Sequence, residues 1–333
     1  MQIGIYEQIL NQLFEEKLAT IDRNRFYIGE RAVKRDEAAK ILAMYLTGIF
    51  EHILADTIDY RENEDEIDVC SSNTSIAKGI ELANSIIKKL VKEFQLQSGN
   101  LISAQAKILT AVIDKTQSDY PDIAKRLEEI MPMKGLINGA LFTGKGLKLY
   151  SELQKEIASS DEIYLMVSFI KKRGLVLLLP QLKEFTNRGG ILKVITTTYM
   201  KATDFDAIKK LSELKNTEIK ITYDETSERL HAKAYIFYRD TGFSTAYIGS
   251  SNLSNAALTS GLEWNTKITM KDLPETINKV AATFEYYWND KEFEYYSEDQ
   301  KERLARALNA EKYFGANNAE VYTMDIMPYS YQQ

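Results

Sequence analysis

Residues 230–265 read LHAKAYIFYRDTGFSTAYIGSSNLSNAALTSGLEWN, and this stretch is the most informative part of the chain for predicting its fold. His231-Ala232-Lys233 opens a run over residues 231–237 that is rich in aromatic and β-branched residues, a composition that predicts a strand. Residues i and i+2 of a strand project from the same face. The sequence therefore predicts an imidazole and an ammonium group side by side.

A turn suited to anions is expected after the next strand. Gly249-Ser250-Ser251-Asn252 lies between a strand predicted over residues 243–248 and a short helix predicted over residues 253–257. Strand-to-helix turns direct backbone N–H groups at anions. Asn252 would add an amide donor, and Ser250 or Ser251 a hydroxyl. The two strands and this turn predict a phosphate site.

The residue types indicate phosphodiester cleavage without a metal or other cofactor. A neutral imidazole can attack phosphorus while a neighbouring lysine neutralises the anionic oxygens. Glu263, eleven residues after Asn252, opens a strand predicted over residues 262–270 and is expected to orient a histidine or tune its protonation. The other histidine, His52, has no lysine two residues on and is interpreted as an ordinary helix residue. One chain thus supplies half of a symmetric site.

His-x-Lys followed by Gly-Ser-x-Asn resembles the signature of the phospholipase D superfamily, and the quoted stretch looks like its nuclease branch. In that branch, homodimerisation completes a single motif per chain. The resemblance, over residues 134–275, implies that His231 forms a phosphohistidine and that the partner's His231 protonates the leaving oxygen. It also implies that Lys233 and Asn252 bind the phosphate, that Ser250 assists, and that Glu263 polarises a histidine.

One position departs from the superfamily pattern. Many members carry Asp five residues after the lysine, where this chain has Tyr238. Asp240 would lie on the same face of an ideal strand, but we do not assign it that role.

Alternating strands and helices predict an α/β fold with a mixed, largely parallel sheet and helices on both faces, which is the phospholipase D-like core that the resemblance implies. Upstream of the motif, strands are predicted over residues 163–169, 191–197 and 218–223, and helices over residues 175–187 and 204–214. The stretch 139–146 has the glycines and lysine of a phosphate loop, but Gly146 stands where a Ser or Thr must hold magnesium. It is interpreted as a linker.

Weaker substrate-binding candidates follow the first of these strands. Ser168 lies at its end, and the basic run Lys171-Lys172-Arg173 comes directly after, where α/β proteins bind ligands. A solvated loop explains the basic run equally well. The chain's net charge of −6 argues against a nucleic-acid binder, but residues 161–275 hold sixteen Lys and Arg against fourteen Asp and Glu. The candidate nuclease portion is therefore near neutral.

The chain is predicted to comprise a helical accessory domain (1–133), the nuclease domain (134–275), a helical linker (276–320) and a tail (321–333). Spacings of three and four between apolar residues predict helices over residues 6–18, 35–58, 74–94, 274–288 and 298–313. The tail resembles the opening of a DEAD/DEAH-type helicase, which implies a C-terminal ATPase module absent from this chain; a disordered tail is the alternative.

The sequence favours a cytoplasmic DNA endonuclease, active as a homodimer and forming the nuclease module of an ATP-dependent restriction or phage-defence enzyme. The sole cysteine, Cys70, excludes an internal disulfide, and neither a signal peptide nor an apolar run of membrane-spanning length is present. Two alternatives stay open. One is a phosphodiesterase acting on another substrate, such as lipid, and the other is a non-catalytic DNA-binding or assembly module of a helicase.

Overall fold

The computed structural model describes residues 69–94, 123–223 and 230–309, together with scattered positions before residue 54. The chain divides into two compact units, Met1–Val112 and Ile113–Gln333. In the first unit, α3 (Val69–Phe94) confirms the helix predicted over residues 74–94. The helices predicted over 6–18 and 35–58 lie mostly outside the described residues, and His52 and the tail lie wholly outside them. The predicted boundaries between domains stay predictions.

None of the helices in the described residues combines the length and apolar character that crossing a bilayer requires.

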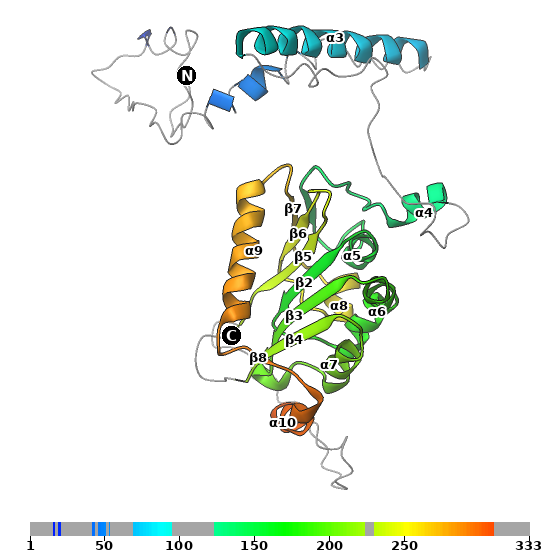
Figure 1. Cartoon of the computed structure of the whole chain (residues 1–333), viewed down its shortest axis with the longest axis vertical. Coiled ribbons are helices and arrows are strands. Elements are labelled where there is room, and N and C mark those ends of the chain that lie inside the picture. The colour runs from blue at the N-terminus through cyan, green and yellow to red at the C-terminus, as the bar shows by residue number, and fades with distance from the viewer. Residues whose placement is uncertain are drawn as a thin grey trace. The chain divides into compact units, whose positions relative to one another are not determined.

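The second unit is built on one eight-stranded mixed sheet with the order β1-β7-β6-β5-β2-β3-β4-β8 (Figure 1). Its strands are β1 (Ala140–Phe142), β2 (Glu162–Val167), β3 (Ile191–Thr197), β4 (Thr217–Thr222), β5 (Lys233–Tyr238), β6 (Thr245–Gly249), β7 (Asn265–Thr269) and β8 (Glu294–Tyr295). Strands β2, β3 and β4 are parallel to one another, and all other pairs are antiparallel.

The mixed α/β fold is confirmed, but the expectation of a largely parallel sheet was wrong. Helices α6 (Lys172–Asn187) and α7 (Phe205–Ser212) cross over between β2, β3 and β4, as parallel neighbours require. By contrast, β5 and β6 follow each other through a short turn and pair antiparallel. The linker interpretation of residues 139–146 was also wrong. That stretch contains β1, which pairs with β7 at the edge of the sheet.

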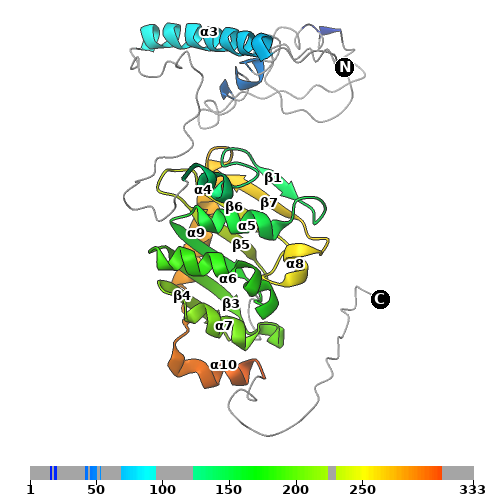
Figure 2. The ribbon, with the colours of Figure 1, turned by 90° about the vertical axis from the view of Figure 1, so that its right-hand side faces the viewer.

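Helices cover both faces of the sheet, as predicted. Figure 2 shows α5 (Leu149–Ala158), α6 and α7 in front of the sheet and α9 (Pro274–Asn289) behind it. The helices of this unit are α4 (Ile123–Ile130), α5 (Leu149–Ala158), α6 (Lys172–Asn187), α7 (Phe205–Ser212), α8 (Asn255–Thr259), α9 (Pro274–Asn289) and α10 (Lys301–Ala307). Because side chains alternate along a strand, Tyr235 packs in the core beneath α5 and α6, while Ile236 packs in the core beneath α9. The site at the strand ends therefore rests on two packed layers.

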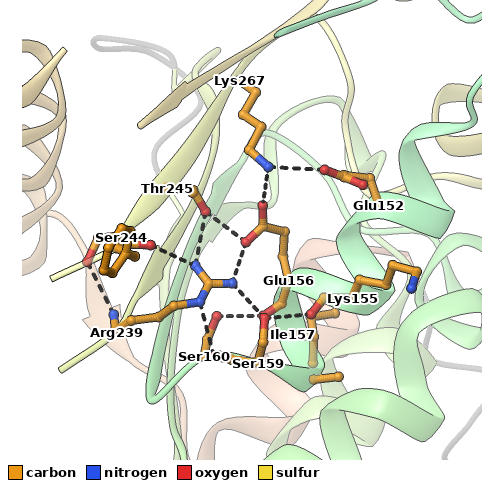
Figure 3. A network of polar contacts seen from close by, with 12 residues as sticks. Glu152, Lys155, Glu156, Ile157, Ser159, Ser160, Arg239, Ser244, Thr245 and Lys267 are labelled. Carbon is orange, nitrogen blue, oxygen red and sulfur yellow. Dashed lines mark hydrogen bonds and ion pairs between the residues drawn. The ribbon is translucent and has the colours of Figure 1, made fainter. Parts of the chain in front are cut away.

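A buried ionic network ties α5 to the antiparallel half of the sheet (Figure 3). Glu156 pairs with Arg239 at 2.6 Å and with Lys267 at 2.9 Å, and Lys267 also pairs with Glu152 at 3.0 Å. Burial alone would raise the pKa of Glu156, but Arg239 and Lys267 overcome that effect and hold it below its ordinary value. Two carboxylates and two cations thus share one closed interior site.

Candidate active site

His231 and Lys233 meet where β5 begins. The strand was predicted from residue 231, whereas β5 begins two residues later, at Lys233. The two side chains nevertheless lie together. The Nζ atom of Lys233 is 3.0 Å from Nδ1 of His231 and donates a hydrogen bond to the His231 carbonyl oxygen at 2.7 Å. Lys233 is buried and His231 is exposed. The lysine is held in place while the imidazole faces solvent.

The surroundings keep the imidazole neutral. Partial desolvation lowers the pKa of His231, and the neighbouring Lys233 lowers it further, which favours the uncharged ring. Burial also lowers the pKa of Lys233, although the nearby Glu263 opposes that shift. A charged ammonium can only donate, so Nδ1 accepts from it and the ring proton lies on Nε2. Attack through Nε2 therefore requires Lys233 to release Nδ1, as it would on turning toward a phosphate.

The predicted turn lies directly after β6 and is joined to the Glu263 segment. The Ser250 hydroxyl donates to the Glu263 carboxylate and accepts the Trp264 N–H at 3.1 Å. The Ser250 N–H donates to the Trp264 carbonyl oxygen at 3.0 Å. A Cβ atom on Gly249 would lie 2.1 Å from that same oxygen, so this close approach requires glycine. The turn and the acidic residue thus form one braced unit.

Asn252 joins the turn to the end of β2. Its buried side chain accepts the Phe169 N–H through Oδ1 at 3.1 Å, which leaves its NH₂ group to donate to a ligand. Ser168 precedes Phe169, and Val167 pairs with Lys233 in the sheet, so Ser168 lies beside the His–Lys segment. Its hydroxyl oxygen is buried and has no hydrogen-bond partner in the part of the chain that the structure describes. Ser168 therefore stays a candidate for binding substrate.

Ser251 faces inward, away from any substrate. It is fully buried, and its hydroxyl donates to the Ala257 carbonyl oxygen at 3.3 Å and accepts from the Asn265 side chain at 2.8 Å. Its N–H donates to Oδ1 of Asn265 at 3.3 Å, and its carbonyl oxygen accepts from the Tyr235 hydroxyl at 3.0 Å. Ser251 thus fixes the turn.

Asn265 and Tyr235 are positioning residues that sequence reasoning missed. Both lie in strands and contact Ser251 with their polar atoms. A signal was present, because an asparagine inside a buried strand must find hydrogen-bond partners. The sequence does not show, however, that Ser251 is the partner of Asn265.

The basic run lies beyond β2, as expected, but carboxylates accompany it. Lys171 pairs with Asp204 at 3.2 Å and Lys172 with Asp206 at 2.6 Å, while Arg173 is exposed in the first turn of α6. Contact of these three residues with substrate stays a prediction.

Neither Glu263 nor Tyr238, which stands at the position of the superfamily Asp, forms a hydrogen-bonded dyad with His231. Within the described residues, no hydrogen bond joins Glu263 to His231 of the same chain; its partner is Ser250. Tyr238 packs edge-on against Tyr164 with ring centroids 4.8 Å apart, and the Asp240 N–H donates to the Asp161 carboxylate. Tyr238 ends β5 and Asp240 follows it, whereas Lys233 begins that strand, so neither Tyr238 nor Asp240 reaches the imidazole of His231.

No three His, Cys, Asp or Glu side chains of the described residues lie together as metal ligands would.

Comparison with known families agrees with this geometry. Residues 153–288 match a family model described as "Cardiolipin synthase, PLD-like domain". This part of the chain has a PLD-like fold. It runs from α5 through most of α9 and contains the whole cluster around His231. A PLD-like domain indicates an enzyme of the phosphodiesterase type.

Several solved structures are similar to the chain, and no curated protein matches it. NucT from Helicobacter pylori is 20% identical over 45% of this chain and 94% of its own, with a TM-score of 0.36. Nuc from Salmonella typhimurium, a phospholipase D family member, is 18% identical over 48% of this chain and 99% of its own, with a TM-score of 0.36. Phosphatidylserine synthase from Haemophilus influenzae is 10% identical over 53% of this chain and 45% of its own, with a TM-score of 0.37.

Proposed function

We propose that this chain is a DNA endonuclease that uses His231 as its nucleophile and needs no metal ion. The observation that carries the proposal is the contact of a neutral, exposed imidazole with a buried lysine beside the Ser250–Asn252 turn. A free imidazole attacks phosphorus directly, and the ammonium of Lys233 together with the NH₂ group of Asn252 neutralises the charge that develops on the phosphate oxygens.

The reaction divides into two displacements. In the first, Nε2 of His231 bonds to phosphorus, the bond to the leaving oxygen breaks, and an acid protonates that oxygen. In the second, water attacks the phosphohistidine, gives up a proton to the group that served as acid, and frees His231. The contact with Lys233 places the ring proton on Nε2, so Lys233 must first turn to the phosphate and release Nδ1. The ring proton then moves through solvent from Nε2 to Nδ1, which frees the Nε2 lone pair for the attack.

The acid is proposed to be the partner's His231, in a homodimer that shares one site. A second imidazole is suited to donate a proton in the first step and accept one in the second near neutral pH. Glu263, held by Ser250, is proposed to orient the imidazole of the partner subunit, since it does not contact that of its own chain.

The biological setting is a further proposal. The resemblance of residues 325–333 to the start of a helicase supports a role as the nuclease module of an ATP-dependent restriction or phage-defence enzyme acting in the cytoplasm.

Cleavage of supercoiled plasmid in excess EDTA tests the proposal, with wild type, His231→Ala and the control His52→Ala compared. We expect nicked or linear product from wild type and from His52→Ala and none from His231→Ala. Magnesium-dependent cleavage, or cleavage by His231→Ala, would refute the proposed chemistry. Release of headgroup from phosphatidylglycerol vesicles, with DNA left intact, would instead favour a lipid phosphodiesterase.

A further inference from the structure

A carboxylate from another loop neutralises the lysine that lies beside the phosphate-binding turn. Lys171 precedes α6, and its N–H donates to the carbonyl oxygen of Leu253, the residue after Asn252, at 2.8 Å. The Nζ atom of Lys171 pairs with Oδ1 of Asp204 at 3.2 Å, and Oδ2 of Asp204 accepts the Lys172 N–H at 2.8 Å. The side chains of Lys171 and Asp204 are 38% and 39% exposed, so a ligand in solvent can reach both.

The packing of α6 fixes Lys171 next to the turn. A Cβ atom on Gly174 would lie 2.5 Å from Cα of Ser254 and 2.6 Å from the Leu253 carbonyl oxygen, so this close approach requires glycine. Ile170 and Leu253 also form a parallel bridge. The ammonium group of Lys171 is thus presented from a fixed backbone beside the residues that are expected to bind the scissile phosphate.

The Asp204 side chain has a second set of partners available. Asp204 is the N-cap residue of α7, with the extended backbone (φ −85°, ψ 128°) that capping residues adopt. Its side chain nevertheless makes no hydrogen bond to the first turn of α7, a helix that the structure describes in full. Figure 2 shows α6 and α7 side by side on one face of the sheet. A rotation of the side chain would bring the carboxylate to the backbone N–H groups at the start of α7, so releasing Lys171 costs little.

The contacts of the Asp204 carboxylate are those that a phosphate oxygen makes with a charged lysine and a backbone N–H. Resting on the proposed function, a DNA strand with its scissile phosphate at His231 brings a neighbouring phosphate to this region. We propose that Lys171 binds the phosphate next to the scissile one, and that the Asp204 carboxylate competes with that phosphate in the free protein. DNA must then displace a carboxylate, which makes its binding weaker than the basic run alone would allow.

DNA binding without cleavage tests the competition. Binding of a fluorescein-labelled DNA duplex is followed by fluorescence anisotropy in EDTA, and every protein carries His231→Ala so that the DNA stays intact. Asp204→Asn removes the charge but keeps an oxygen that can accept the Lys172 N–H. Asp272→Asn is the matched control, because Asp272 also accepts a backbone N–H, that of Gly139, and follows the end of β7 that lies away from the turn.

We expect Asp204→Asn to tighten DNA binding about 2- to 5-fold, which is the range for an exposed ion pair, and Asp272→Asn to leave it unchanged. Lys171→Met should weaken binding and lower the salt dependence of log K by about one ion, because one phosphate contact is lost. In combination with Lys171→Met, Asp204→Asn should no longer tighten binding, since the competition needs the lysine. Thermal unfolding followed by circular dichroism checks that each variant folds.

Unchanged or weaker binding by folded Asp204→Asn would show that the carboxylate only braces the two loops, and would overturn the proposal. A gain that persists beside Lys171→Met would overturn it too, because the gain would then reflect general repulsion of DNA. The same holds for an unchanged salt dependence in Lys171→Met, or for no DNA binding by any form. If the gain depends on Lys171 but the chain with its native His231 cleaves no DNA, the phosphate contact stands and the proposed function fails.

Discussion

Replacing Lys267 with methionine should destabilise the second unit strongly, because the lysine neutralises two carboxylates that have no access to water. Lys267, Glu152 and Glu156 are all fully buried. Without the ammonium, Glu156 keeps only its pair with Arg239, and Glu152 loses its ion pair altogether. Removing one partner of a buried ion pair costs about 3–5 kcal/mol of unfolding free energy. For a unit of this size, that corresponds to a fall in Tm of roughly 6–20 °C.

The destabilisation should depend on pH in a defined direction. In the wild type the pKa of Glu156 is held below 4.5, so its contribution is present above that pH and is lost as the pH falls through the lowered value. In the variant, Arg239 alone opposes the desolvation of Glu156, so the pKa of Glu156 rises and its protonation relieves part of the penalty as the pH falls. The deficit relative to wild type should therefore shrink from pH 8 to pH 5.

Thermal unfolding of both proteins across that pH range, with Lys279→Met as the exposed control, measures the effect. The double variant Glu152→Gln, Lys267→Met should recover part of the loss, because it removes the carboxylate that is left without an ion pair. A loss below about 1 kcal/mol, or one that grows as the pH falls, would refute the role assigned to the buried network.

Three further substitutions test the site. Asn265→Ala removes both hydrogen bonds to Ser251, so the unfolding free energy should fall by about 1–3 kcal/mol. The rate constant kcat should fall by a larger factor than KM changes. An unaltered kcat in folded protein would contradict the positioning role. Lys233→Met should raise the pKa of His231, since Lys233 lowers it in the wild type. NMR titration of the imidazole in both proteins measures the shift, and an unchanged pKa would count against the contact. Gly249→Ala places a Cβ atom 2.1 Å from the Trp264 carbonyl oxygen and should abolish cleavage by displacing the turn, so a fully active variant would show that the close approach is not needed.

The local features of the site could be predicted because short-range geometry decides them. His231 and Lys233 lie together as predicted, although β5 begins only at Lys233, because two residues separate them along an extended segment. The order strand, turn, helix around Ser250 and Asn252 was also predicted. The strand that contains residues 191–197 was predicted with its observed bounds, since glycines precede it and a continuous apolar and β-branched run fills it.

Features that depend on long-range pairing could not be predicted. Glu152 and Lys267 are 115 positions apart, and only the pairing of β7 with β6 over α5 brings them together. The sequence pattern of Ser250-Ser251 does not say which hydroxyl faces outward; the side chain of Asn265 decides that by holding Ser251 inside. The short strand β1 was missed because its three residues show no periodicity until β7 pairs with them.

Acid-free trapping of the covalent intermediate tests the central claim most directly. Wild-type protein is mixed with an internally ³²P-labelled oligonucleotide in EDTA, denatured in alkali within one turnover, and digested for peptide mapping. We predict label on the peptide that contains His231, stable to alkali and released by acid, with none on His231→Ala. Cleavage by the wild type with no label on that peptide would contradict the proposed phosphohistidine mechanism.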